Sequence, residues 1–105
     1  MRVAVLGGTG SFGKALAARL AAVGEDEIVI GSRDAARAAA AAVELGGGAV
    51  TGATNADAVR GADLAVLAVK AEAALETARD VAGALGATPL LSVASAIRVE
   101  KLPLP

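Results

Sequence analysis

The stretch from Arg2 to Gly13, R-V-A-V-L-G-G-T-G-S-F-G, constrains the fold more than any other part of the chain. Its apolar run, V-A-V-L, predicts a buried strand that ends abruptly in glycines, and a helical pattern begins within a few residues. The spacing G-x-G-x-x-G falls on Gly8, Gly10 and Gly13. A strand, a glycine-rich turn and a helix in this order are typical of the first unit of a dinucleotide-binding domain.

Each glycine of this motif has a separate physical reason. Gly8 permits a tight turn off the strand, Gly10 has no Cβ that would hold a pyrophosphate away from the backbone, and Gly13 lets the helix lie close to the strand. The first amides of the helix, and its dipole, then point at the phosphates. The alternative is a purely structural turn, because the chain contains 13 glycines. The strand before the motif and the helix after it favour the binding interpretation.

Composition narrows the classes of function. With 105 residues the chain forms one small domain, and a net charge of −1 from ten basic and eleven acidic residues favours neither nucleic acid nor a membrane surface as a partner. The chain has neither cysteine nor histidine, so thiol chemistry and the commonest general base and metal ligand are excluded. No apolar run approaches the length of a membrane span, and we expect a cytoplasmic protein without a metal site.

The rest of the chain alternates between apolar runs and helical patterns. Gly24 is expected to end the first helix, Asp34 to cap the second, and Asn55 or Asp57 to cap the third. We predict strands at 3–6, 27–31, 49–51, 64–69 and 89–93, and helices at 14–23, 34–45, 55–60 and 71–85. In the last helix, the inward side chains are predicted to be Ala74, Leu75, Ala78, Val81, Ala82 and Leu85.

This alternation predicts an α/β fold with a Rossmann-like, doubly wound parallel sheet in three α/β/α layers and the strand order 3-2-1-4-5. Residues 1–95 would form the domain, and residues 96–105 an extended tail. A ligand of such a sheet lies at the carboxyl ends of the strands, where the strand order reverses. The glycine stretch 7–13, Ser32-Arg33 and Val69-Lys70 all fall at such ends.

The end of the second strand indicates which dinucleotide is bound. A domain that prefers NAD places Asp or Glu there to bind the ribose hydroxyls. This chain has Ser32 and Arg33 instead, and Arg37 follows one helical turn later. A hydroxyl and two guanidinium groups suit the 2′-phosphate of NADP. The alternative is that both arginines are solvated surface charges.

The motifs G-G-T-G-S-F-G, I-V-I-G-S-R-D and A-D-L-A-V-L-A-V resemble the N-terminal domain of the F420-dependent NADP oxidoreductases from Met1 to about Val93. The resemblance implies that Thr9 contacts the cofactor phosphates, within a loop that also contains Ser11 and Phe12. It implies that Val69 lines the nicotinamide pocket, and that Ser92 and Val93 lie near the bound deazaflavin. Arg37 stands where the family more often has lysine.

Two departures from the family leave alternatives open. Lys70 follows the fourth strand where the family usually has proline; it could meet a phosphate or an acidic substrate, or be an exposed lysine that opens a helix. Family members also continue into a helical C-terminal domain that helps to form the deazaflavin site and a dimer. The chain could therefore be a domain of a longer protein, a truncated reading frame or a free-standing module, and a homodimer is among the partners to test.

The resemblance implies hydride transfer between NADP(H) and coenzyme F420. The cofactors carry that chemistry, so no catalytic side chain is expected, and the absence of histidine is no objection. Two alternatives remain from the sequence: an NADP-binding module without catalysis of its own, and a related reductase domain for an imine or carbonyl substrate.

Overall fold

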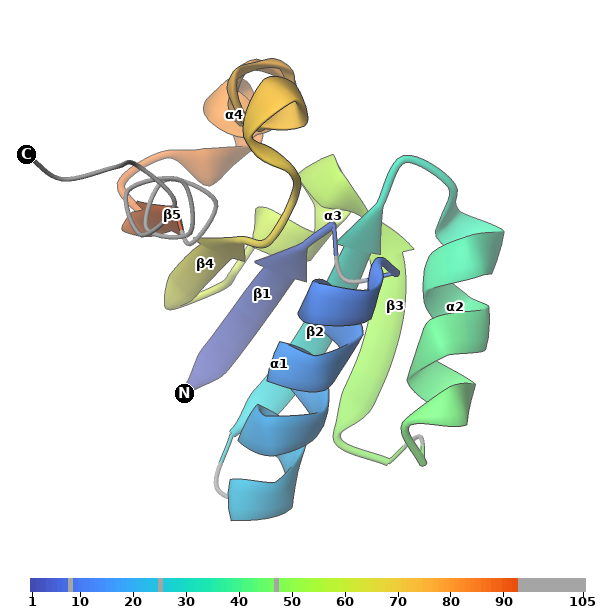
Figure 1. Ribbon diagram of the computed structural model, residues 1–105. Helices are drawn as coiled ribbons and strands as arrows, with labels where there is room; N and C mark the ends of the chain where they lie inside the picture. The colour runs from blue at the N-terminus through green and yellow to red at the C-terminus, as the bar shows by residue number, and fades with distance from the viewer. Residues whose placement is uncertain (8, 25, 47, 93–105) are drawn as a thin grey trace, which may run out of the picture.

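The computed structural model describes residues 1–7, 9–24, 26–46 and 48–92. They form a five-stranded parallel sheet with the order β3-β2-β1-β4-β5, flanked by helices (Figure 1). The predicted strand order is thereby confirmed. The strands are β1 (Arg2–Leu6), β2 (Glu27–Ser32), β3 (Val50–Thr54), β4 (Leu64–Leu67) and β5 (Leu90–Ser92). The helices are α1 (Ser11–Val23), α2 (Ala35–Glu44), α3 (Asn55–Val59) and α4 (Ala71–Leu85).

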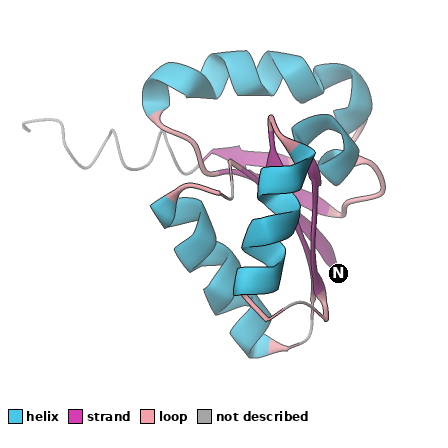
Figure 2. Cartoon of the chain, turned by 90° about the vertical axis from the view of Figure 1, so that its right-hand side faces the viewer, coloured by secondary structure: helices cyan, strands magenta, loops and turns pink. Residues whose placement is uncertain are grey.

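Alternate residues of β1 enter two separate cores, one on each face of the sheet. Val3 and Val5 pack in the core that α1 and α2 cover, whereas Ala4 and Leu6 pack in the core that α3 and α4 cover. Strands that are buried on both faces are typical of a parallel sheet between two helical layers. The cartoon in Figure 2 shows helices on both sides of the strands.

Local sequence explains one end of each of the first three helices. Gly24 ends α1 in the left-handed conformation, at φ 78°, and its N–H donates to the carbonyl of Ala21. Asp34 caps α2, as predicted, because its side chain accepts hydrogen bonds from two backbone amides. The predicted cap of α3 was wrong: Thr54, not Asn55 or Asp57, accepts from the Asp57 amide at 3.2 Å.

Helix α4 packs differently from the prediction. Val81 is fully buried, and Ala74 and Leu85 pack against the same core. Leu75 is instead 63% exposed, and Ala82 is exposed as well, so the prediction was wrong for these two residues. The reason is that α4 lies mainly against α3, whose short face covers only a narrow stripe of α4.

The strands also differ in extent from the prediction. Strand β3 continues to Thr54 rather than 51, and β4 ends at Leu67 rather than 69. Val69 and Lys70 therefore lie in the connection after β4. The predicted tail lies outside the described residues. Within the described ranges, no helix combines the length and the apolar character that crossing a membrane requires.

Candidate functional site

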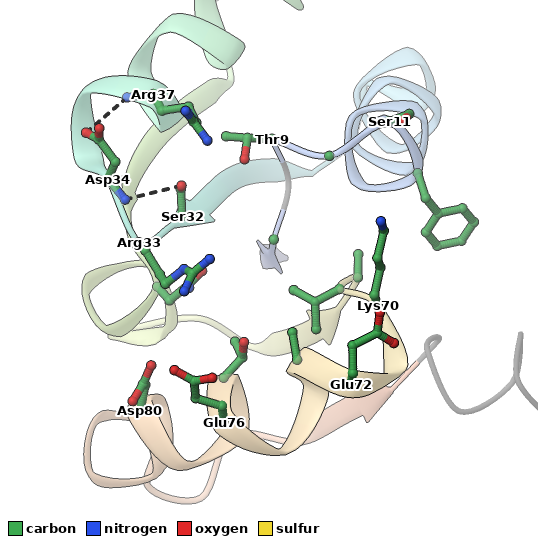
Figure 3. A pocket seen from close by; sticks show the side chains of 18 residues that line it. Thr9, Ser11, Ser32, Arg33, Asp34, Arg37, Lys70, Glu72, Glu76 and Asp80 are labelled. Carbon is green, nitrogen blue, oxygen red and sulfur yellow. Dashed lines mark hydrogen bonds between the residues drawn. The ribbon is translucent and has the colours of Figure 1, made fainter.

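One cavity of about 680 Å³ lies at the carboxyl ends of β1, β2 and β4, where the strand order reverses. Its volume is within the range of small-molecule sites. Figure 3 shows the side chains that surround it. They come from the loop after β1, the end of β2, the connection after β4, α4, and the first turns of α1, α2 and α3. The lining residues are Gly7, Thr9, Gly10, Ser11, Phe12, Ser32, Arg33, Asp34, Arg37, Asn55, Ala68, Val69, Lys70, Glu72, Ala73, Glu76, Thr77 and Asp80.

The turn after β1 also requires Gly7, which lies outside the predicted G-x-G-x-x-G motif. Gly7 has φ +75°, and a Cβ there would overlap the side chain of Val69. Its carbonyl accepts from the Gly10 amide at 3.2 Å, which closes the turn. At Gly10, by contrast, a Cβ would meet only the Gly7 carbonyl oxygen, at 3.7 Å. Gly7 is therefore required by the fold, while Gly10 leaves open space beside the cavity. Gly8 lies outside the described residues.

The start of α1 has no side chain to satisfy its amides. Gly10 is the N-cap residue, no side chain caps the helix, and the first turn contains no acidic residue. The first N–H groups of a helix have no partner within the helix and carry the positive end of its dipole. Gly10, Ser11 and Phe12 all line the cavity. The cavity therefore receives a set of hydrogen-bond donors that suits an anion.

The end of β2 contributes a hydroxyl and two cations. Ser32 is only 7% exposed, and its Oγ accepts from the Asp34 amide at 3.3 Å, which leaves the hydroxyl proton for another acceptor. Arg33 and Arg37 are exposed and line the cavity. Asp34 Oδ1 accepts from the amides of Ala36 at 2.9 Å and Arg37 at 3.4 Å, so this carboxylate serves the helix. In Figure 3, both arginines extend from this side of the cavity.

The opposite side of the cavity is acidic, which the sequence analysis missed. Glu72, Glu76 and Asp80 recur at a spacing of four residues along α4 and line the cavity (Figure 3). Residues four apart share one face of a helix, so the spacing of these residues could have indicated an acidic face on α4. Among the described residues, none of these carboxylates, nor Arg33, Arg37 or Lys70, forms an ion pair. The cavity thus has a basic side and an acidic side with unpaired charges.

Buried polar side chains contribute to the lining of the cavity. Among the described residues these are Ser32, Asn55 and Thr77, each 7% exposed. Asn55 Oδ1 has no hydrogen-bond partner among the described residues. Buried polar groups in folded proteins nearly always have a partner. Sequence reasoning considered Asn55 only as a helix cap, and nothing in its local pattern indicated a position in the cavity.

The structure brings together most of the predicted site residues. Nine of them line the cavity: Thr9, Gly10, Ser11, Phe12, Ser32, Arg33, Arg37, Val69 and Lys70. Gly13 is buried within α1. Ser92 ends β5 and is not among the lining residues. Gly8 and Val93 lie outside the described residues. The role of each in binding stays a prediction.

The sheet topology and the position of the cavity define the class of protein: a domain with a Rossmann-like fold and a cavity at the point where the strand order reverses. More particularly, the chain belongs to the family described as "NADP oxidoreductase coenzyme F420-dependent", whose family profile matches residues 2–96.

Relatives of known description agree with this family. The chain is 46% identical over 91 residues to the F420-dependent NADP reductase of Methanothermobacter marburgensis, and 48% identical over 83 residues to that of Methanothermobacter thermautotrophicus. These matches cover 81% and 73% of this chain, but 40% and 35% of the two relatives. The chain therefore spans less than half the length of the curated relatives that it matches.

Solved structures show the same architecture. A candidate F420-dependent NADP-reductase from Arthrobacter sp. FB24 superposes with a TM-score of 0.73 at 28% identity, over 87% of this chain and 44% of that one. A protein from Lactobacillus casei matches with a TM-score of 0.56 at 24% identity, over 88% of this chain and 46% of the other. The second likeness concerns the fold alone.

Proposed function

We propose that this chain is the NADP(H)-binding domain of an oxidoreductase that transfers a hydride between NADP(H) and coenzyme F420. The observation that carries the proposal is the convergence, at one cavity, of the uncapped start of α1 and the cations that follow β2. The family membership and the two relatives named for F420-dependent NADP reduction support the choice of cofactors.

The residues of the cavity fit a dinucleotide with a 2′-phosphate. The amides at the start of α1 would bind the pyrophosphate, because no side chain occupies them and Gly10 allows close approach. The Ser32 hydroxyl would donate to the 2′-phosphate, and Arg33 and Arg37 would bind the same group. The Asp34 carboxylate has a separate role, because its Oδ1 accepts from two amides of α2 and so caps that helix.

When bound, NADP(H) and F420 supply the hydride chemistry. The chain's own part is to hold the nicotinamide cofactor in one orientation. Val69 and Lys70 lie after β4. The side chain of Val69 lies against Gly7 at the turn before α1, and Figure 3 shows Lys70 on the same side of the cavity as Ser11. They would flank the end of the cofactor furthest from Arg33. Cytoplasmic location and dimerisation stay predictions.

Titration of the purified chain with NADPH, followed by fluorescence, tests the proposal. We expect saturable binding to the wild type and loss of binding in Gly10→Val. The unliganded turn has room for a Cβ at residue 10, and the branched valine side chain would occupy the space that the pyrophosphate needs. An unchanged circular dichroism spectrum would show that Gly10→Val still folds. Failure of the wild type to bind NADPH, or equal binding by Gly10→Val, would contradict the proposal.

A second assay addresses catalysis. NADPH oxidation is measured with and without F420, at saturating concentrations of both. Because the chain matches less than half of its relatives' length, we expect at most trace turnover from the chain alone. Turnover of roughly 1–1000 per second, the usual range of enzymes, would show that the chain builds the whole site by itself.

A further inference from the structure

Asn55 is one of two described residues with a buried side-chain atom that lacks a hydrogen-bond partner; the other is Arg2, whose Nε lies 3.4 Å from Glu27 Oε2 in an ion pair. Asn55 is 7% exposed, it lines the cavity, and its Oδ1 has no hydrogen-bond partner among the described residues. A buried carbonyl oxygen without a partner costs stability, since water no longer donates to it. One reason for a fold to retain such a group is a ligand that supplies the missing donor.

Asn55 is not the N-cap of α3. Thr54 supplies the side-chain cap of α3, so Asn55 is not needed for that purpose. Gly31 of the neighbouring strand β2 leaves room for the Asn55 amide. A Cβ at residue 31 would lie 2.7 Å from Asn55 Oδ1, which is too close for a normal contact. Gly31 has an ordinary backbone conformation, because its φ is not positive. Close packing against Asn55, Leu6 and Ala58 therefore explains the glycine.

The position of Asn55 indicates which part of a dinucleotide it would contact. Thr54 is the register partner of Ser32 at the ends of β3 and β2, so Asn55 lies one residue beyond the proposed 2′-phosphate site. The groups nearest to a 2′-phosphate are the ribose and the adenine. Both carry donors, the ribose 3′-hydroxyl and the adenine 6-amino group. The phosphate itself presents acceptors, which cannot satisfy a carbonyl oxygen.

We propose that Asn55 is an adenosine-recognition residue that accepts a hydrogen bond from the bound nucleoside through Oδ1. This inference rests on the proposed function, because it requires NADP(H) in the cavity. It differs from the role of Ser32 and Arg33 in one respect. Asn55 contacts the adenosine and not the 2′-phosphate. Because NADP and NAD share the adenosine, Asn55 strengthens the binding of both by the same factor.

The test compares Asn55→Ala and Asn55→Leu with the wild type. A neutral hydrogen bond corresponds to a change of about three- to tenfold in affinity. We expect both variants to lose roughly that factor for NADP and for NAD, with the NADP/NAD ratio unchanged. Asp57→Ala is the matched control, because Asp57 is exposed, lies in the same helix and does not line the cavity.

Thermal unfolding of the unliganded proteins separates binding from folding. Asn55→Leu is expected to unfold at or above the wild-type temperature, because an unsatisfied buried oxygen is replaced by an apolar group of similar size. Wild-type affinity for NADP in both variants would overturn the inference while leaving the proposed function intact. A changed NADP/NAD ratio would also overturn it. Absence of NADP binding in the wild type itself would overturn both.

An analogue of NADP with hypoxanthine in place of adenine identifies the donor. It replaces the 6-amino group with a carbonyl oxygen. If the adenine amine is the donor, the wild type binds the analogue several-fold more weakly than NADP, and Asn55→Ala removes that difference. If the ribose hydroxyl is the donor, Asn55→Ala weakens both ligands by the same factor. Either result supports the inference.

Discussion

Helices α1 and α2 both begin at the carboxyl edge of the sheet beside the same cavity, but only α2 has its first amides occupied by a side chain. Asp34 accepts from two amides of α2, whereas Gly10 offers α1 no side chain at all. An N-cap carboxylate stabilises a helix and also repels an anion. The comparison indicates that a side chain satisfies the first amides of α2 within the fold, whereas the first amides of α1 are available to a ligand.

The largest expected effect comes from giving α1 the cap that α2 already has. In Gly10→Asp, the new carboxylate would accept from the α1 amides and place a negative charge where the pyrophosphate is proposed to bind. Since each hydrogen bond to a charged group contributes about 1.5–3 kcal/mol, we expect at least a hundredfold loss of NADP affinity. Isothermal titration measures the loss. The fold should be slightly stabilised, by a few tenths of a kcal/mol, because Asp is a better N-cap than Gly. Retained affinity would show that α1 does not bind the phosphates.

The second prediction concerns cofactor choice at the start of α2. Two charge-assisted contacts near an exposed rim contribute about 3 kcal/mol, or roughly a hundredfold preference for NADP over NAD. We expect Arg33→Ala to remove about tenfold of this preference, and Ser32→Asp to remove more by repelling the 2′-phosphate. Dissociation constants for both cofactors measure the ratio.

The control for cofactor choice is Arg19→Ala, an exposed arginine of α1 that does not line the cavity. It should leave the NADP/NAD ratio unchanged. Equal affinity of the wild type for NAD and NADP, or an unaltered ratio in Ser32→Asp, would disprove the 2′-phosphate assignment.

Removal of the α2 cap should affect stability rather than binding. Asp34→Ala leaves two helix amides without their acceptor, at a cost of about 1 kcal/mol in the free energy of unfolding. For a domain of this size, that lowers the melting temperature by about 4–8 °C. NADP affinity should not fall, because an anion beside Arg33 has been removed. A clear loss of affinity would mean that Asp34 itself contacts the cofactor. Thermal unfolding and titration of one preparation measure both quantities.

The architecture was predictable because it depends on patterns that the whole chain repeats. Apolar runs separated by helical segments gave the strand order, and Asp34 and Gly24 marked helix ends through local chemistry. The surroundings of α4 were not predictable in the same way. Its alanine-rich sequence offers several similar faces, and packing against α3 decides which one is buried. Leu75 is exposed for that reason.

The sequence predicted the basic side of the cavity but not its acidic side or Asn55. The basic side follows from single positions after β1 and β2, where a strand end can be recognised in the sequence. The acidic side and Asn55 depend on how α4 and α3 are placed in space, which no local pattern specifies. Gly7 is intermediate: the sequence shows a pair of glycines, but only the closeness of Val69 reveals why residue 7 must be one.

The smallest expected effect concerns the acidic side of the cavity, which opposes the open start of α1. Glu76 and Asp80 are exposed and unpaired among the described residues, so they repel a phosphate only weakly through water. A unit charge at about 10 Å contributes about 0.4 kcal/mol in water. We therefore expect the double variant Glu76→Gln, Asp80→Asn to bind NADP about two- to fourfold more tightly at low salt.

This gain should vanish at about 0.5 M salt, because the Debye length is then about 4 Å, well below the separation of about 10 Å between the charges. Glu27→Gln, an exposed residue at the opposite end of the sheet, is the matched control and should show no gain. Weaker binding by the double variant at low salt would have the opposite meaning: the carboxylates would be acceptors for donors on the cofactor. The predicted gain would show instead that the carboxylates of Glu76 and Asp80 repel the phosphates toward α1. This repulsion would lower the affinity slightly and favour one orientation of the bound dinucleotide.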